Sequence, residues 1–202
     1  RDRSTRMSLN SSNPRVIWEV KPQADLENIT GEQISTPEFK MSDYVKGVVP
    51  GTVFTAYVEA GTVPDPNYAD NIYKVDETFY NRPFWYRTEF ELPSSYSEGK
   101  RVWLHFDNTN RFADFYFNGE KISGTKTSTK DVSGHMLRSK FDVTNLVKKS
   151  GKNVIAVLIT DADQKKTRKA KDPYGVACSP SYLAGAGWDW MPYVPVSYTH
   201  LT

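Results

Sequence analysis

The sequence is poor in the residues that build disulfide frameworks and metal centres. One of its 202 residues is cysteine, Cys178, and three are histidine. A lone cysteine excludes an internal disulfide, so a hydrophobic core must hold the fold, and Cys178 is interpreted as a small buried residue rather than a nucleophile. His105, His135 and His200 share no ligand spacing with Cys178 or with a carboxylate. The sequence therefore gives no support to a metal-dependent hydrolase, and no cofactor is expected.

The sequence also lacks long hydrophobic runs and a large excess of charge of one sign. The longest apolar run, Val154 to Ile159, is far shorter than the roughly 20 residues of a membrane-spanning helix. The net charge of +2 is too small to imply a polyanionic partner. One basic cluster lacks aromatic neighbours and a recognition element, so it is interpreted as a solvated loop rather than a nucleic-acid footprint. That cluster consists of Lys165, Lys166, Arg168, Lys169 and Lys171. Neither membrane nor nucleic acid is expected as a partner.

The first residues of the given sequence do not have the pattern of a secretion leader. Residues Arg1 to Arg6 are polar and charged, whereas a secretion signal places an apolar stretch after a basic start. A secretion signal is therefore either removed or absent. The sequence does not fix the compartment, and a periplasmic or extracellular location is favoured over a cytoplasmic one.

What the chain does contain favours strands and turns. Aromatic residues make up 13% of it, and it has 12 glycines and 12 prolines. Asn118-Gly119 between two apolar segments predicts a tight hairpin, and residues 52–60 fit one or two helical turns that end at Gly61. The expected strands are residues 16–20, 84–92, 101–106, 112–117, 136–141 and 154–159. The predicted fold class is all-β: a single antiparallel β-sandwich or jelly roll with one or two short helical turns.

The segment Gly187-Trp188-Asp189-Trp190 places one carboxylate between two indoles, with Gly185 before it and Pro192 after it, in a setting that indicates a loop. Indole faces stack against C–H-rich surfaces, and a carboxylate accepts paired hydroxyl donors. These residue types suit a sugar. The alternative is that Trp188 and Trp190 cap the core and Asp189 makes a turn.

A second loop runs from Pro64 to Asn71 and is rich in turn formers and amides. Its two prolines, Pro64 and Pro66, restrict the backbone and lower the entropy cost of holding polar groups in place. A ligand loop and an ordinary turn are both open interpretations. Arg87 and Arg111 are weaker candidates, because an arginine on a sandwich strand is more often part of a surface ion pair.

The order of the motifs resembles the amino-terminal sugar-binding domain of glycoside hydrolase family 2, from about Trp18 to Pro195. The combination of an Asp-Pro loop with the tryptophan loop is most similar to exo-β-D-glucosaminidases, β-mannosidases and the endo-β-mannosidase type. The β-mannosidase form usually has glycine after the second tryptophan, where this chain has Met191, so the sugar is left open. The motifs that carry the resemblance are Val49–Val53, Asp65-Pro66-Asn67-Tyr68 with Asn71, Phe84–Arg87, Phe117–Gly119, Phe141–Thr144, Gly151–Val154 and Gly187–Trp190.

The resemblance implies a domain that shapes the substrate pocket of a retaining glycosidase. The catalytic glutamates would lie in a TIM barrel that follows an immunoglobulin-like domain, and neither region is in this sequence. Asp189 would accept hydrogen bonds from the carbohydrate substrate, Trp188 and Trp190 would form a wall, and Asp65 and Asn71 would add polar contacts or brace their loop. The alternative is a freestanding lectin-like module.

Three segments are expected along the chain. Residues 1–14 form a flexible start, residues 15–196 form the sugar-binding domain, and residues 197–202 depart from the family. This last segment is similar to read-through of foreign sequence, so it is expected to be a foreign tail on a truncated fragment, without function.

Overall fold

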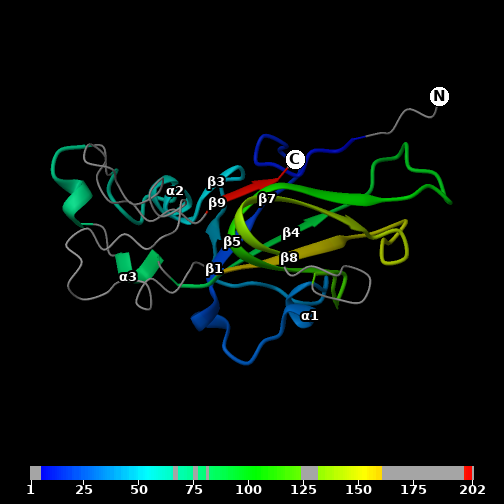
Figure 1. Cartoon of the computed structure of the whole chain (residues 1–202), viewed down its shortest axis with the longest axis horizontal. Helices are drawn as coiled ribbons and strands as arrows, with labels where there is room; N and C mark the ends of the chain where they lie inside the picture. Colours follow the sequence, from blue (N-terminus) through cyan, green and yellow to red (C-terminus); the bar gives the residue numbers. More distant parts are fainter. Residues whose placement is uncertain are drawn as a thin grey trace.

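The computed structural model describes residues 6–65, 68–74, 77–80, 82–123, 132–160 and 198–201. In this part of the chain the elements are mostly strands, with short helical segments between them (Figure 1). In chain order they are β1 (Glu19–Pro22), η1 (Gln23–Leu26), α1 (Gly31–Ile34), β2 (Val45–Lys46), β3 (Gly51–Thr52), α2 (Val53–Glu59), η2 (Asn71–Lys74), α3 (Glu77–Tyr80), β4 (Phe84–Phe90), β5 (Trp103–Phe117), β6 (Glu120–Lys121), β7 (Val132–Asp142), β8 (Asn153–Thr160) and β9 (Tyr198–Leu201).

The strands form an antiparallel sandwich, as the sequence predicts. They are connected in the order β2-β1-β4-β8-β5-β9-β3, and β6 and β7 also pair with β5. Every described pairing is antiparallel. The central position predicted for residues 154–159 is confirmed, because β8 pairs with β4 on one side and with β5 on the other.

Strand β5 bends so sharply that it belongs to both layers. Its first part pairs with β7 and β9, and residues 112–117 pair with β8. The rings of Phe106 and Phe115 lie 4.3 Å apart, whereas nine residues of straight strand would span about 30 Å. Shifts in register between Phe106 and Arg111 mark the bend, as expected for bulged strands. The prediction of separate strands at residues 101–106 and 112–117 was therefore wrong. The polar residues 107–111 between them also adopt strand conformation, because this segment pairs with β7 and β9.

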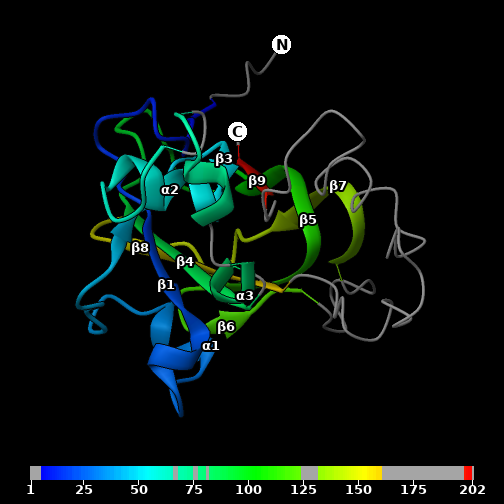
Figure 2. The ribbon, with the colours of Figure 1, turned by 90° about the vertical axis from the view of Figure 1, so that its left-hand side faces the viewer.

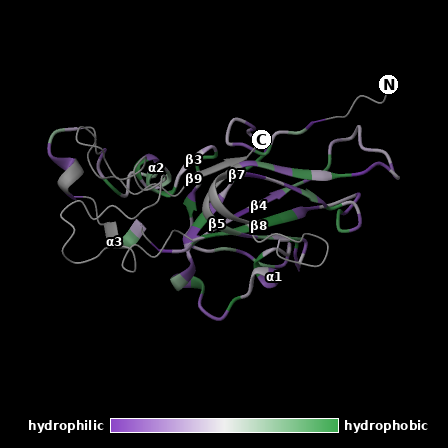
Figure 3. Ribbon diagram, viewed as in Figure 1, coloured by the Kyte–Doolittle hydropathy of each residue, from purple (hydrophilic) through white to green (hydrophobic). Residues whose placement is uncertain are grey.

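The main core lies between the two layers. Phe106, Phe115 and Phe141 pack against one another there, with ring centroids 4.3–5.9 Å apart. Strand β8 is buried along most of its length, and its hydrophobic colouring stands out against the hydrophilic loops in Figure 3.

A second, smaller core lies beneath α1 on the outer face of β4 and β8. It includes Ile34, Trp85 and Ala156, which are almost fully buried. Gly31 opens α1 directly against Tyr116, where an added Cβ would lie 2.4 Å from the ring. Glycine at this position therefore permits a close approach of helix to sheet. Strand β4 is consequently buried on both faces.

Arg87 is a buried residue, which corrects the expectation of a surface ion pair. Its side chain is 1% exposed. It donates hydrogen bonds to the main-chain carbonyls of Ile34 (2.8 Å), Thr36 (2.9 Å) and Phe39 (3.0 Å), and its guanidinium contacts the carboxylates of Glu19 and Glu89. The cation thus fastens the segment around α1 to the sheet.

The Asn118-Gly119 hairpin is confirmed. Both residues have positive φ, 47° and 88°, as a two-residue turn of this kind requires. The Asn118 side chain also donates to the Leu146 carbonyl (2.8 Å) and to Asn153 Oδ1 (2.9 Å), and it accepts from the Val154 amide (2.8 Å). The turn is therefore tied to the loop that leads into β8.

The two ends of the chain contact the sandwich. The Trp18 indole donates to the Leu9 carbonyl (2.6 Å), and Leu9 packs against the main core. At the other end, β9 pairs with β3 and β5 through its backbone. The flexible start and the foreign tail remain predictions.

Candidate functional site

Helices α2 and α3 lie at one end of the sandwich, where the Pro64–Asn71 loop connects them (Figures 1 and 2). The helical turns expected before Gly61 are confirmed as α2. Thr52 caps the start of this helix by accepting a hydrogen bond from the Thr55 amide (3.0 Å). Gly61 follows its end with φ of 73°, the left-handed conformation that glycine adopts readily.

An aromatic cluster joins the two helices to β4. The ring of Tyr57 from α2 lies 5.2 Å from Phe79 and 5.7 Å from Tyr80, both of α3, and 6.1 Å from Phe84 of β4. Phe54 adds a further contact with Tyr80 at 5.1 Å. All these pairs are edge to face, a favourable geometry for aromatic rings. Both helices that flank the loop therefore rest on one packed base.

Arg82 lies against this aromatic cluster, and Tyr57 contributes the hydroxyl group of one of its rings. The Arg82 Nε donates to the Phe79 carbonyl (2.9 Å), and its guanidinium lies 4.4 Å from the centre of the Phe79 ring. Burial raises the pKa of Tyr57 to about 12, and the neighbouring Tyr80 and Asp25 act in the same direction. The Tyr57 side chain therefore stays neutral over the physiological range.

The Pro64–Asn71 loop is braced by its own hydrogen bonds. The Asp65 carbonyl accepts from the Tyr68 amide (3.2 Å) and from the Asn71 carboxamide (3.0 Å). Lys74 contacts Asp70 (3.1 Å) and the Asn71 carboxamide oxygen (3.2 Å). Tyr68 is 74% exposed. The loop thus presents Asp65 and Tyr68 at the surface.

Of the predicted site residues, Asp65 and Asn71 are brought together in this loop. Trp188, Asp189 and Trp190 lie outside the described residues, as do Cys178 and the basic cluster from Lys165 to Lys171. The sugar-binding roles of these residues therefore remain predictions.

Metal-ligating residues do not gather in the described part of the chain. His105 is an exposed residue of β5, and His135 and His200 belong to β7 and β9. Among residues 6–65, 68–74, 77–80, 82–123, 132–160 and 198–201 there is no group of three or more histidine, cysteine or carboxylate residues that could hold a metal ion. No helix within these ranges is long and apolar enough to cross a bilayer.

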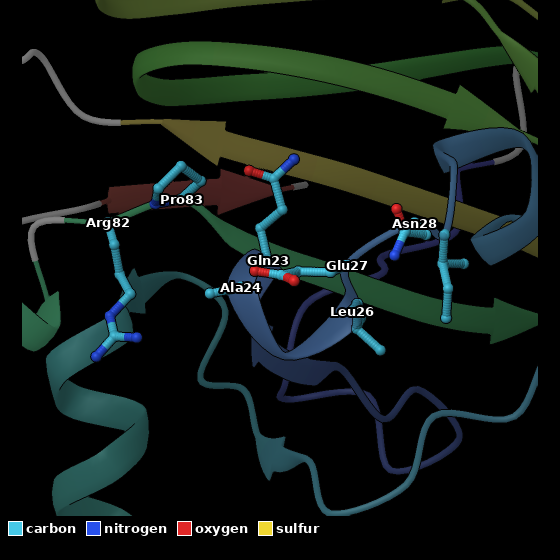
Figure 4. A pocket seen from close by; sticks show the side chains of 8 residues that line it. Gln23, Ala24, Leu26, Glu27, Asn28, Arg82 and Pro83 are labelled. Atoms are coloured by element: carbon cyan, nitrogen blue, oxygen red, sulfur yellow. The ribbon is translucent and has the colours of Figure 1, made fainter.

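A cavity of about 400 Å³ opens next to Arg82, on the side of η1 (Figure 4). No local sequence pattern predicted this cavity, because its walls come from two segments that are distant in sequence, residues 23–29 and 82–83. The lining residues are Gln23, Ala24, Leu26, Glu27, Asn28, Ile29, Arg82 and Pro83.

Comparison with known proteins relates the chain to domains of glycosidases. Residues 18–197 match the model of the glycosyl hydrolase 2 galactose-binding domain-like family. The mannosylglycoprotein endo-β-mannosidase of Lilium longiflorum is 30% identical over 189 residues, which are 86% of this chain and 18% of that enzyme. The exo-β-D-glucosaminidase of Streptomyces avermitilis is 30% identical over 126 residues, 62% of this chain and 13% of that enzyme.

A solved structure supports the same fold. The β-D-mannosidase of Dictyoglomus thermophilum superposes with a TM-score of 0.65 at 22% identity, over 95% of this chain and 21% of that one. The chain therefore spans about a fifth or less of the length of these relatives. Since the family model covers nearly the whole sequence, the chain belongs to the glycosyl hydrolase 2 galactose-binding domain-like family.

Proposed function

We propose that this chain is the amino-terminal sugar-binding domain of a longer, retaining glycosidase of family 2, where it helps to shape the substrate pocket. The observation that carries the proposal is the family match over residues 18–197. The relatives named above are an endo-β-mannosidase and an exo-β-D-glucosaminidase. Hydrolysis of a β-mannoside or β-glucosaminide is therefore the proposed reaction of the full-length protein.

The bond cleavage would take place in a neighbouring catalytic domain. Retaining hydrolysis needs one carboxyl group as acid and base and a second as nucleophile, about 5 Å apart. Two glutamates of a TIM barrel, preceded by an immunoglobulin-like domain, would supply them. The part played by this chain is to position the sugar, and correct orientation contributes several kcal/mol to catalysis.

In this proposal, the contacts with the sugar come from two loops. Asp189 accepts hydrogen bonds from hydroxyl groups or an amine, and Trp188 and Trp190 stack against the ring. Asp65 and Asn71 belong to the second loop, and its internal bracing supports this role, because a loop already held by the Asn71–Asp65 hydrogen bond loses little entropy when it binds.

The decisive experiment uses Asp189→Ala in the full-length protein. A hydrogen bond to a charged group contributes about 1.5–3 kcal/mol, so kcat/KM on aryl β-glucosaminides and β-mannosides should fall about ten- to 150-fold. Glu98→Ala, which removes only an exposed ion pair with Lys149 and lies outside both proposed sugar loops, is the control. Wild-type kinetics in Asp189→Ala would overturn the role of this residue.

The partners and the compartment complete the proposal. Carbohydrate is the substrate, and the further domains of the same chain are the partners of this one. A periplasmic or extracellular location is tested by fractionation of cells that express the full-length protein, where activity confined to the cytoplasm would contradict it.

A further inference from the structure

The cavity beside Arg82 joins two segments that are distant in sequence. Its first wall is η1 with the residues that follow it, and its second is Arg82 and Pro83 just before β4. The Gln23 amide donates to the Pro83 carbonyl (2.9 Å) and closes one side. Figure 4 shows Gln23 and Glu27 between Arg82 and Asn28 in this view.

The walls are held before any ligand arrives. Leu26 is 7% exposed and packs into the second core with Ile34 and Trp85. The Ile29 amide donates to the Leu26 carbonyl (3.2 Å), and Arg82 is fixed on Phe79 by its hydrogen bond and ring contact. Leu26 and Arg82 are therefore held in place, whereas the side chains of Gln23, Glu27 and Asn28 are exposed at the opening.

Several polar groups of the lining are not used by the fold. Within the described residues, the side chains of Gln23, Glu27 and Asn28 form no hydrogen bond or ion pair with the protein. Two carboxamides and a carboxylate offer donors and acceptors that can pair with adjacent hydroxyl groups. Ala24, Ile29 and Pro83 add apolar surface that suits the C–H face of a sugar ring.

Charge and volume narrow the class of ligand. The lining has one carboxylate, Glu27, and one guanidinium, Arg82, so their formal charges cancel and a neutral ligand is favoured over a strongly charged one. The volume of about 400 Å³ falls within the range of roughly 300–1,000 Å³ that is usual for small-molecule sites.

We infer that this cavity, called here the Gln23 pocket, is a binding site for one neutral hexopyranoside ring, separate from the Asp65 loop. The inference rests on the proposed function, because both assign carbohydrate contacts to this end of the domain. The Phe79 ring contacts Arg82 of the pocket at 4.4 Å and Tyr57 of α2, the helix that precedes the Asp65 loop, at 5.2 Å.

The test is NMR titration of the 202-residue chain with methyl β-D-mannopyranoside up to about 100 mM, because an open pocket of this kind is expected to bind in the millimolar range. We expect chemical-shift changes at the amides of residues 23–29 and 82. Gln23→Ala and Asn28→Gly should each weaken binding about tenfold, since each removes a carboxamide. Asn28 has φ of 68°, so glycine keeps the backbone conformation.

The matched control is Asp43→Gly. Asp43 has φ of 49° and is exposed, but it does not line the pocket, so this variant should bind like the wild type. Absence of shifts at residues 23–29, or shifts unchanged in both pocket variants, would overturn the inference. Shifts confined to residues 62–71 would overturn the Gln23 pocket while supporting the proposed sugar loop, and the kinetics of Asp189→Ala test the proposed function independently.

Discussion

The Arg87 guanidinium donates to the Ile34 carbonyl across 53 positions of sequence, at 2.8 Å. A single side chain thus connects the sheet to the helix that covers its outer face. This contact and three others made by described residues lead to separate predictions.

Replacement of Arg87 by methionine should destabilise the chain by about 3–5 kcal/mol, because it leaves a partly buried group of carboxylates without their cation. The carbonyls of Ile34, Thr36 and Phe39 also lose their donor. Urea unfolding followed by tryptophan fluorescence measures the change. Arg101→Ala is the control, since Arg101 is 74% exposed and lies 3.8 Å from Asp142, and it should cost at most about 1 kcal/mol. Equal stability of the two variants would contradict the anchoring role of Arg87.

Asn118→Gly should cost about 2–4 kcal/mol. Glycine keeps the turn conformation, but the variant loses three hydrogen bonds, to Leu146, Asn153 and Val154, each of which contributes about 0.5–1.5 kcal/mol. Asn28→Gly is the control. It also replaces an asparagine of positive φ, 68°, but the Asn28 side chain forms no hydrogen bond with the described part of the chain. Its unfolding free energy, measured in parallel, should stay within about 0.5 kcal/mol of wild type.

Tyr57→Phe should make the chain less sensitive to alkaline unfolding. The folded-state pKa of Tyr57 is about 12, above the usual value near 10. The stabilisation is complete below pH 10 and is lost as the pH rises towards 12, because only the unfolded state ionises in this window. Thermal melts at pH 9, 10 and 11 measure the effect. If the melting temperatures of wild type and variant fall equally between pH 9 and pH 11, ionisation of Tyr57 is not the cause of the alkaline destabilisation.

Asn71→Ala in the full-length protein should lower kcat/KM about tenfold while the melting temperature changes little. The variant loses the hydrogen bond to the Asp65 carbonyl (3.0 Å), so the loop is no longer held in one geometry, and small displacements near a substrate are costly to the rate. Steady-state kinetics and thermal melts together separate positioning from stability. A large fall in melting temperature without a change in kcat/KM would assign Asn71 to the fold alone.

Local signals in the sequence predicted the elements that local chemistry determines. Asn118-Gly119 specified its hairpin because both residues adopt positive φ, and Gly61 marked the end of α2 for the same reason. Unbroken apolar residues from 154 to 159 identified the central strand.

Long-range packing determined what the sequence did not predict. Residues 107–111 are polar and were expected between two strands, yet pairing with β7 and β9 keeps them extended. Arg87 was expected at the surface, because no local pattern indicates that α1 and the residues after it cover the outer face of β4. Of the candidate site, the sequence predicted the Asp65–Asn71 loop but not the Gln23 pocket.

The bend in β5 also has a consequence for the unfolding of the domain. The fifteen residues of this strand pair with β7 in one layer and with β8 in the other, so we expect the loss of one set of hydrogen bonds to disturb the other. The amide hydrogens of the two layers should therefore exchange with deuterium in a single cooperative event.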